Sequence, residues 1–296
     1  MPRRHWQVNK HTGSLYEYPY RSLTQLNEDS VAKYCSSLRR RFGANRKTPE
    51  AAEQWIARTY ISLKYLLAAS VMLTSAEFAA TRNLRIVEPY LLYYSLFNSS
   101  RALCLMIPEL QWKGGAVIES LSHTKVQNLT VDCLGHLSAE VADQYKDVYE
   151  RALVSREMLS YRFPAQGLTG RLAKILPPID DVVDSCQIVA EVAQLHSECL
   201  QSAFKNLPSV GFPETSEPLR KFFQYEHKSL GTPLIDQEDW YRKWQFIRHS
   251  SRPVSLHLVA REGLIEDFFG AWSYDGEKPD QYDADKADWG IIFDFF

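Results

Sequence analysis

The amino-acid sequence predicts a mainly α-helical protein built around an up-and-down helical bundle that spans residues 48–207. Apolar side chains recur there at three- and four-residue steps, which is the spacing of one helical face. Capping residues and prolines precede these periodic segments. After residue 207 glycine and proline become frequent, so we expect residues 208–296 to form a small mixed α/β appendage. Residues 1–47 form an N-terminal extension without a clear period.

Two long helices are predicted in the first half of the bundle. Residues 48–50 place a threonine cap, a proline and a glutamate at a helix start, where the negative charge favours the helix dipole. The apolar stripe of this helix covers residues 56–71. A glutamate followed by a proline predicts a second start at residue 88, and that helix extends to about residue 105.

A short helix and a longer one are predicted next. The short helix covers residues 116–129, with Ser122 and His123 inside it or at its start. Ser138 is a good N-cap for the longer helix. That helix is expected to end before Pro164, because proline interrupts helices.

The clearest helical period covers residues 182–203. Either Asp180 or Asp181 is expected to cap this helix. His196 lies on its apolar stripe, so we interpret His196 as a core histidine with satisfied hydrogen bonds rather than as a ligand or catalytic group.

The two ends of the chain give weaker signals. The basic run at residues 38–41 predicts a solvated helix face, with a phosphate or RNA contact as the alternative. Residues 253–260 alternate weakly, as in a strand. The acidic residues 275–288 predict a solvated loop rather than a metal site. Residues 290–296 predict a terminal anchor strand, whose aromatic side chains would bind a partner protein if they were not packed.

Composition excludes several classes of protein. A formal net charge of -2 and a pI of about 6.5 provide no global basic field for nucleic acid or an anionic membrane. The 5 cysteines are widely spaced, which favours core positions in a reducing compartment. The longest apolar run, residues 65–73, is too short to span a membrane, and no secretory signal is evident. We therefore expect a cytoplasmic protein without a membrane segment, a cofactor or a metal.

Three blocks of residues occur in an order that resembles a known family. A helix with paired aromatics, a phenylalanine and an arginine is followed by a histidine at a helix start, and then by a helix with an arginine motif. The matching residues are Tyr93, Tyr94, Phe97, Arg101, Ala102, Ser122, His123, Arg156 and Tyr161. These blocks resemble the HEPN family over roughly residues 48–207. The resemblance implies a helical bundle common among prokaryotic ribonucleases, toxins and their inactive relatives.

The resemblance also implies candidate site residues. In the ribonucleases of this family an arginine is followed a few residues later by a histidine, and two copies pair across a dimer. Here Arg156 is followed at that place by Tyr161, a poor base at neutral pH. The implied catalytic residues are Arg156, Tyr161 and His123, with the imidazole transferring a proton and the guanidinium stabilising the phosphate. Asn98 and Arg101 are candidates for binding nucleotide or phosphate.

The sequence leaves several hypotheses about function open. The first is a homodimeric HEPN-like protein that cleaves or binds RNA in a prokaryotic stress or defence system, such as a toxin–antitoxin or antiviral system. The second, favoured by Tyr161, is a catalytically inactive HEPN-like subunit that docks a partner protein through its C-terminal region. A scaffold unrelated to HEPN predicts no convergence of the polar residues. If these residues have only structural roles, Arg156 pairs with a carboxylate such as Glu157, and His123 is a cap or core residue. His257, which also follows an arginine, is expected at the surface or in packing.

Overall fold

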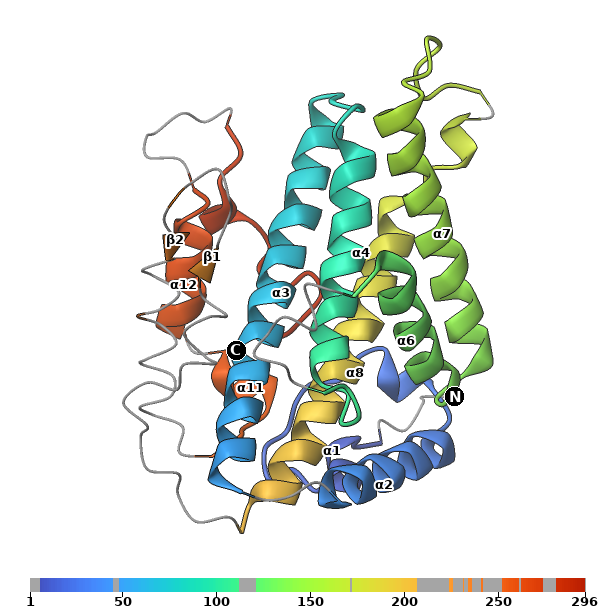
Figure 1. The fold of residues 1–296 in the computed structure, drawn as a ribbon. Coiled ribbons are helices and arrows are strands. Elements are labelled where there is room, and N and C mark those ends of the chain that lie inside the picture. Colours follow the sequence, from blue (N-terminus) through green and yellow to red (C-terminus); the bar gives the residue numbers. More distant parts are fainter. Residues whose placement is uncertain are drawn as a thin grey trace.

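The fold is mainly helical, as the sequence predicts, and its long helices form a bundle (Figure 1). The structure is a computed structural model. It describes residues 6–44, 48–111, 121–170, 172–206, 252–260, 262–273 and 281–295, with a few positions between 224 and 241. The predicted helix start at residue 116 and most of the predicted appendage before residue 252 lie outside the described residues.

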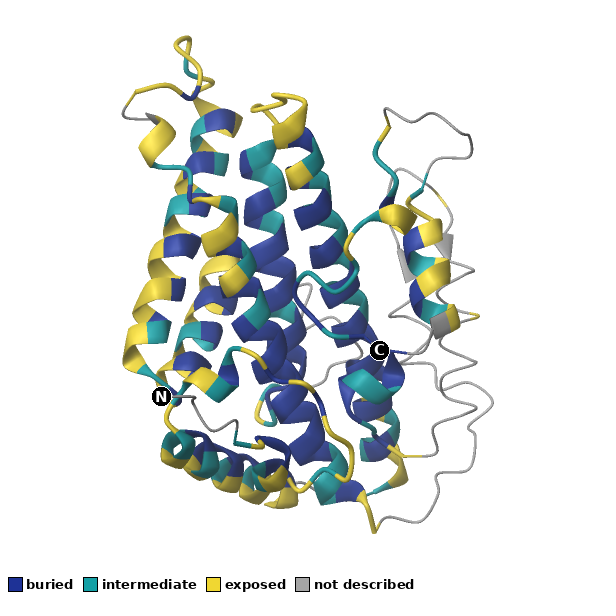
Figure 2. Cartoon of the chain, turned by 180° about the vertical axis from the view of Figure 1, so that it is seen from behind, coloured by how far each residue is buried: buried dark blue, intermediate teal, exposed yellow. Residues whose placement is uncertain are grey.

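Four long helices and one shorter helix make up the bundle. The long helices are α3 (Pro49–Thr81), α4 (Glu88–Leu105), α7 (Ala139–Tyr161) and α8 (Ile179–Phe204). The shorter α6 (His123–Gly135) packs beside α4 and α7. Since α4 contacts all four of the others, it is the central helix. Buried residues concentrate on α3, α4 and α8, whereas α7 has an exposed outer face (Figure 2).

Side-chain caps begin three of these helices, and two of them, α3 and α7, begin where the sequence predicts a start. The hydroxyl oxygens of Thr48, Ser122 and Ser138 accept hydrogen bonds from the backbone N–H groups three residues later, at 3.2, 3.2 and 3.4 Å. Each bond satisfies a donor that has no partner within the helix. Ser122 therefore stands at the cap of α6, and His123 is the first residue of that helix.

The predicted cap of α8 was wrong. Pro178 occupies the cap position, and Asp180 and Asp181 lie in the first turn without a capping hydrogen bond. Their carboxylates favour the helix start through the dipole instead. The interpretation of His196 on this helix is confirmed, because its ring is fully buried and both ring nitrogens have hydrogen-bond partners.

The predicted N-terminal extension packs on α8 from residue 6 to residue 44. It contains α1 (Asn9–Thr12), the short 3-10 helix η1 (Leu23–Gln25) and α2 (Glu28–Ala44). The buried carboxylate of Glu191 on α8 accepts the backbone N–H groups of residues 21, 22 and 23 at 2.8, 3.0 and 2.8 Å. These bonds fix the start of η1 against the bundle.

Helix α2 carries the basic run at residues 38–41. Arg39 and Arg40 are exposed, which confirms the solvated helix face for these two residues. Arg41 instead forms an ion pair with Glu109, and Leu38 is buried. Arg39 and Arg40 therefore lie on the solvent side of an amphipathic helix, whose opposite side carries Leu38.

The described C-terminal residues contain helices and two very short strands. The helices are α11 (Leu256–Val259), α12 (Glu262–Gly270) and the 3-10 helix η3 (Ala284–Lys286). The strands β1 (Gln224–Tyr225) and β2 (Leu234–Ile235) pair antiparallel. The prediction of a strand at residues 253–260 was wrong, because α11 occupies that segment and buries two residues one helical turn apart.

The chain end packs on the N-terminal segment. Ile292, Phe293 and Phe295 are buried, and the ring of Phe293 lies 5.0 Å from that of Tyr18. The predicted anchor is therefore present, but among residues 290–295 it is irregular backbone rather than a strand. Because these aromatic side chains are packed, they do not form the exposed partner surface that the sequence offered as an alternative.

Helix α3 contributes much of the core. By length and composition, α3 is the one helix among the described residues that could cross a membrane. Its apolar stretch is therefore longer than the run at residues 65–73. Most of its apolar window is buried inside the protein. The core also contains all 5 cysteines, each without a disulfide.

Candidate functional site

An aromatic stack joins α4 to the start of α6. Tyr93 and Phe97 lie one turn apart on α4 with ring centroids 6.2 Å apart, and the His123 ring stacks on Phe97 at 4.3 Å. The hydroxyl of Tyr93 is 2.5 Å from Nδ1 of His123. Because Ser122 caps α6, the imidazole is held at a defined helix start above this stack.

Two arginines reach the same stack from different positions. The guanidinium carbon of Arg101 on α4 lies 4.3 Å from the Tyr65 ring centroid and 5.4 Å from that of Phe97. The guanidinium carbon of Arg156 on α7 lies 4.8 Å from the Tyr93 ring centroid. Cations at these distances are attracted by the ring faces. We call His123, Arg101 and Arg156, with the rings of Tyr93 and Phe97, the imidazole–arginine cluster.

The cluster keeps its imidazole neutral. Partial burial lowers the pKa of His123, and the positive charges of Arg156 and Arg101 lower it further, against a smaller opposing effect of Glu157. Both arginines therefore act electrostatically on one ring. His123 itself is exposed, so its neutral ring is accessible to a ligand at neutral pH.

The arginines have unused hydrogen-bonding capacity. The Nε atoms of Arg101 and Arg156 are buried and have no hydrogen-bond partner. Arg156 forms an ion pair of 3.5 Å with Glu157, which gives partial support to the structural interpretation of this arginine. One half-exposed carboxylate does not balance two guanidinium groups, so the cluster favours an anion.

Two predicted site residues lie away from the cluster. Tyr161 is the last residue of α7, its side chain is 74% exposed, and no contact with His123 is seen in the described part of the chain. Asn98 is buried, and its amide nitrogen lies 3.3 Å from the sulfur of Met72 on α3. The structure thus brings together His123, Arg101 and Arg156, but neither Asn98 nor Tyr161.

Sequence reasoning missed two aromatic residues of the cluster surroundings. Tyr65 on α3 supports Arg101, and the Tyr149 ring on α7 meets Tyr93 edge to face at 5.7 Å. Aromatic residues at helical spacing are ordinarily core residues, so the sequence carried no signal that set these two apart. Tyr65 and Tyr149 reach the cluster only because α3, α4 and α7 pack together.

Arg252 and His257, a second arginine followed by a histidine, make separate contacts. Arg252 donates to the backbone oxygen of Lys205 at 2.6 Å. His257 lies 3.3 Å from the backbone oxygen of Asp294 through Nδ1, and its ring packs edge to face on Tyr18. These contacts fit the predicted packing role of His257.

Comparisons with models of known protein families, with curated proteins and with solved structures find no match. Within the described residues, no group of three histidine, cysteine, aspartate or glutamate side chains is arranged to hold a metal ion. Inference about function therefore depends on the geometry and charge of the chain itself.

Proposed function

We propose that this chain is a HEPN-like protein that binds the phosphodiester backbone of RNA through the imidazole–arginine cluster. The observation that carries the proposal is the position of two guanidinium groups on the rings of one aromatic stack, beside one exposed neutral imidazole on which both act. A phosphate has the charge and the acceptor oxygens that these donors lack.

The aromatic rings support this role by restricting the arginines. Arg101 lies over Tyr65, and Arg156 lies over Tyr93, so less side-chain freedom remains to be lost when a phosphate binds. His123 adds a further contact. When the Tyr93 hydroxyl donates to Nδ1, Nε2 carries the proton and is able to donate to a phosphate oxygen.

The other tautomer of His123 supports cleavage. When Nδ1 carries the proton and the Tyr93 oxygen accepts it, Nε2 of the neutral ring is free to take the proton of a ribose 2′-hydroxyl. The 2′ oxygen then bonds to phosphorus, the bond from phosphorus to the 5′ oxygen breaks, and the imidazolium returns its proton to that oxygen. Arg101 and Arg156 would stabilise the extra negative charge on the phosphate. No metal takes part in this sequence of steps.

A second candidate function is RNA or protein binding without cleavage. The specific observation in its favour is Tyr161, which replaces the histidine of the family motif and lies exposed outside the cluster. The ion pair between Arg156 and Glu157 also reduces the charge available to a transition state. In this case the chain is an interaction subunit, alone or as a homodimer.

Fluorescence anisotropy with labelled single-stranded RNA in the presence of chelator tests binding, and gel analysis of the same mixtures tests cleavage. Arg101→Lys and Arg156→Lys keep the charge but lose the planar fork, so we expect each to weaken binding by about tenfold. Arg40→Lys, at an exposed position on α2, is the matched control and should leave affinity unchanged. His123→Asn should abolish cleavage by a cleaving enzyme.

The outcomes separate the two candidates. RNA fragments that disappear in His123→Asn establish a ribonuclease, whereas cluster-dependent binding without fragments establishes a binding subunit. The proposal fails if the wild-type protein does not bind RNA, or if Arg40→Lys weakens binding as much as the two cluster variants. Thermal unfolding of each variant verifies that its fold is retained.

A further inference from the structure

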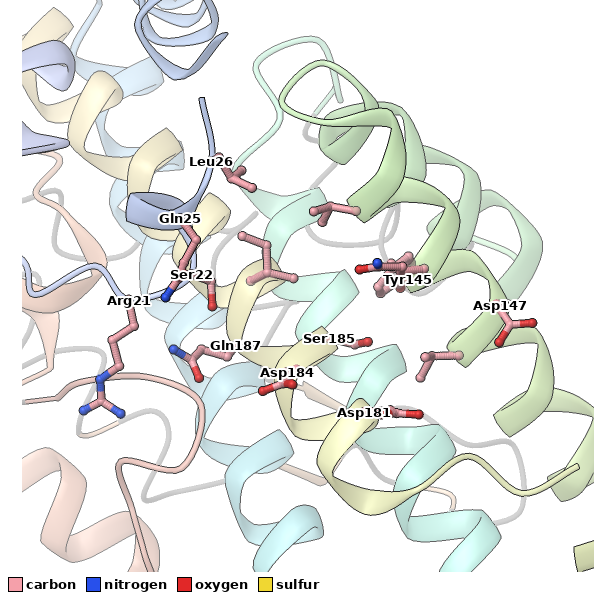
Figure 3. A pocket seen from close by; sticks show the side chains of 14 residues that line it. Arg21, Ser22, Gln25, Leu26, Tyr145, Asp147, Asp181, Asp184, Ser185 and Gln187 are labelled. Carbon is pink, nitrogen blue, oxygen red and sulfur yellow. The ribbon is translucent and has the colours of Figure 1, made fainter. Parts of the chain in front are cut away.

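A groove of about 780 Å³ opens between the segment around η1 and helices α7 and α8 (Figure 3). Its volume lies in the range of small-molecule sites. No residue of the imidazole–arginine cluster lines it. The groove is therefore a separate feature, and its occupant is independent of the proposed RNA function.

The groove has an apolar floor. Val148 from α7 and Ile188 from α8 face it from opposite sides, with Leu26 from the segment after η1 and the ring of Tyr145. Ile188 and Tyr145 are buried, so this floor is part of the hydrophobic core. A ligand here would place an aliphatic portion against these side chains.

Three carboxylates stand on the walls. Asp147 comes from α7, and Asp181 and Asp184 come from the first turns of α8 on the opposite wall (Figure 3). The Asp147 carboxylate forms an ion pair of 3.6 Å with Arg151, whereas Asp181 and Asp184 form no ion pair with any described residue. The Arg21 guanidinium points away from these carboxylates (Figure 3) and lies 3.9 Å from Asp294. The groove thus carries excess negative charge.

One hydroxyl in the groove is available to a ligand independently of the charges. Ser185 is only 7% exposed, lines the groove, and has no hydrogen-bond partner among the described residues. Its oxygen points from α8 into the groove toward α7 (Figure 3). Because this oxygen makes no hydrogen bond to the described protein, it is free to bond to a donor or acceptor on a ligand in the groove.

The arrangement of the carboxylates selects the shape of the occupant. A metal ion needs ligand oxygens gathered within about 2.6 Å of one point, and no described group of three acidic residues meets this requirement. Carboxylates on opposite walls above an apolar floor suit positive centres that are separated by methylene groups. We propose that this groove binds a linear aliphatic polyamine, with ammonium groups at Asp181, Asp184 and Asp147 and methylene groups over Val148 and Ile188.

Isothermal titration calorimetry of the full chain with spermidine, at about 0.15 M salt, tests the proposal because this salt screens diffuse surface attraction. The test variant is Asp181→Asn with Asp184→Asn. The matched control is Asp143→Asn with Asp180→Asn, which removes the same charge from exposed positions on α7 and α8 outside the groove. Ser185→Val is a second test that changes no charge.

We expect saturable spermidine binding that weakens at least about tenfold in the test variant and stays within about twofold in the control. Ser185→Val should weaken binding as well, because it removes the inward hydroxyl. The proposal is overturned if wild-type protein shows no saturable binding, or if the test and control variants weaken it equally. An unchanged affinity in both Ser185→Val and the test variant would also overturn it.

Discussion

The buried histidine of α8 makes a prediction about stability against pH. Nδ1 of His196 lies 3.0 Å from the backbone oxygen of Met106, so Nδ1 carries the ring proton. Nε2 lies 2.8 Å from the hydroxyl of Tyr34, which donates to it. A second ring proton would displace that donor, and burial in the core lowers the pKa of His196 to about 4.

The size of this effect on the free energy of unfolding follows from the difference in proton binding between the native and unfolded states. A histidine in the unfolded chain has a pKa of about 6.5. Between about pH 6.5 and about pH 4 the unfolded state therefore holds one more proton at His196 than the native state. The free energy of unfolding falls on acidification by about 1.4 kcal/mol per pH unit, or about 3 kcal/mol over this window.

Glu198, on the same helix, acts in the opposite direction. It accepts hydrogen bonds from the Thr12 hydroxyl at 2.6 Å and the Gln194 amide at 2.9 Å, and its burial raises its pKa from 4.5 to about 7. Between these two values the native state holds one more proton than the unfolded state. Acidification through this window therefore stabilises the fold by about 3 kcal/mol through Glu198. The effects of His196 and Glu198 cancel between about pH 4.5 and 6.5.

Urea unfolding of wild type, His196→Gln and Glu198→Gln from about pH 7.5 to about pH 4.5 separates the two effects. Relative to wild type, His196→Gln should become more stable on acidification, since it no longer loses stability through the imidazole. Glu198→Gln should become less stable relative to wild type, since it no longer gains stability through the carboxyl. Other titrating groups are common to all three proteins. Parallel pH profiles for the three would refute the reasoning.

Three further changes probe other buried contacts. Arg58→Met should cost about 3 kcal/mol or more in urea unfolding, because the guanidinium donates to three backbone oxygens at the end of α4 and just after it, at 2.6 to 2.8 Å. A loss below about 1 kcal/mol would contradict this. Glu191→Ala should expose residues 21–23 to limited proteolysis, because three backbone N–H groups lose their acceptor; an unchanged digestion pattern would argue against the anchor. Phe293→Ala should lower stability by about 3 to 5 kcal/mol, measured by the same urea assay, because the ring is fully buried; an effect near zero would mean that the chain end is not anchored.

Local signals in the sequence predicted the bundle well. A hydroxyl side chain directly before a periodic apolar segment marks a helix start, so Thr48 and Ser138 could be recognised without any knowledge of packing. Ser122 was placed only inside a helix expected from residue 116 or at its start. Only the basic part of helix α2 was predicted to be helical, although the buried residues Val31, Tyr34, Leu38 and Phe42 follow helical spacing along its length. The aromatic and polar residues around that segment obscured a period that was present.

The site could be predicted only in part, because side-chain direction changes steeply along a helix. Arg101 follows Phe97 by four residues and so shares its face of α4, which made their association predictable. Asn98 follows Phe97 by one residue and is turned by about 100°, toward α3. Tyr161 follows Arg156 by five residues and is turned by about 140° from it. That rotation, with the end of α7, explains why Tyr161 is exposed while Arg156 reaches Tyr93.

Helix α7 serves two surfaces of opposite charge, and this arrangement makes their independence testable. Asp147 lines the groove, and Arg156, which belongs to the cluster, follows it by nine residues, or about 13 Å along the helix axis. That separation exceeds the screening length of about 8 Å at physiological salt. With each ligand titrated separately, Arg156→Lys should leave spermidine affinity unchanged and Asp184→Asn should leave RNA affinity unchanged. A change beyond about threefold in either cross-test would show that the two surfaces are coupled rather than independent.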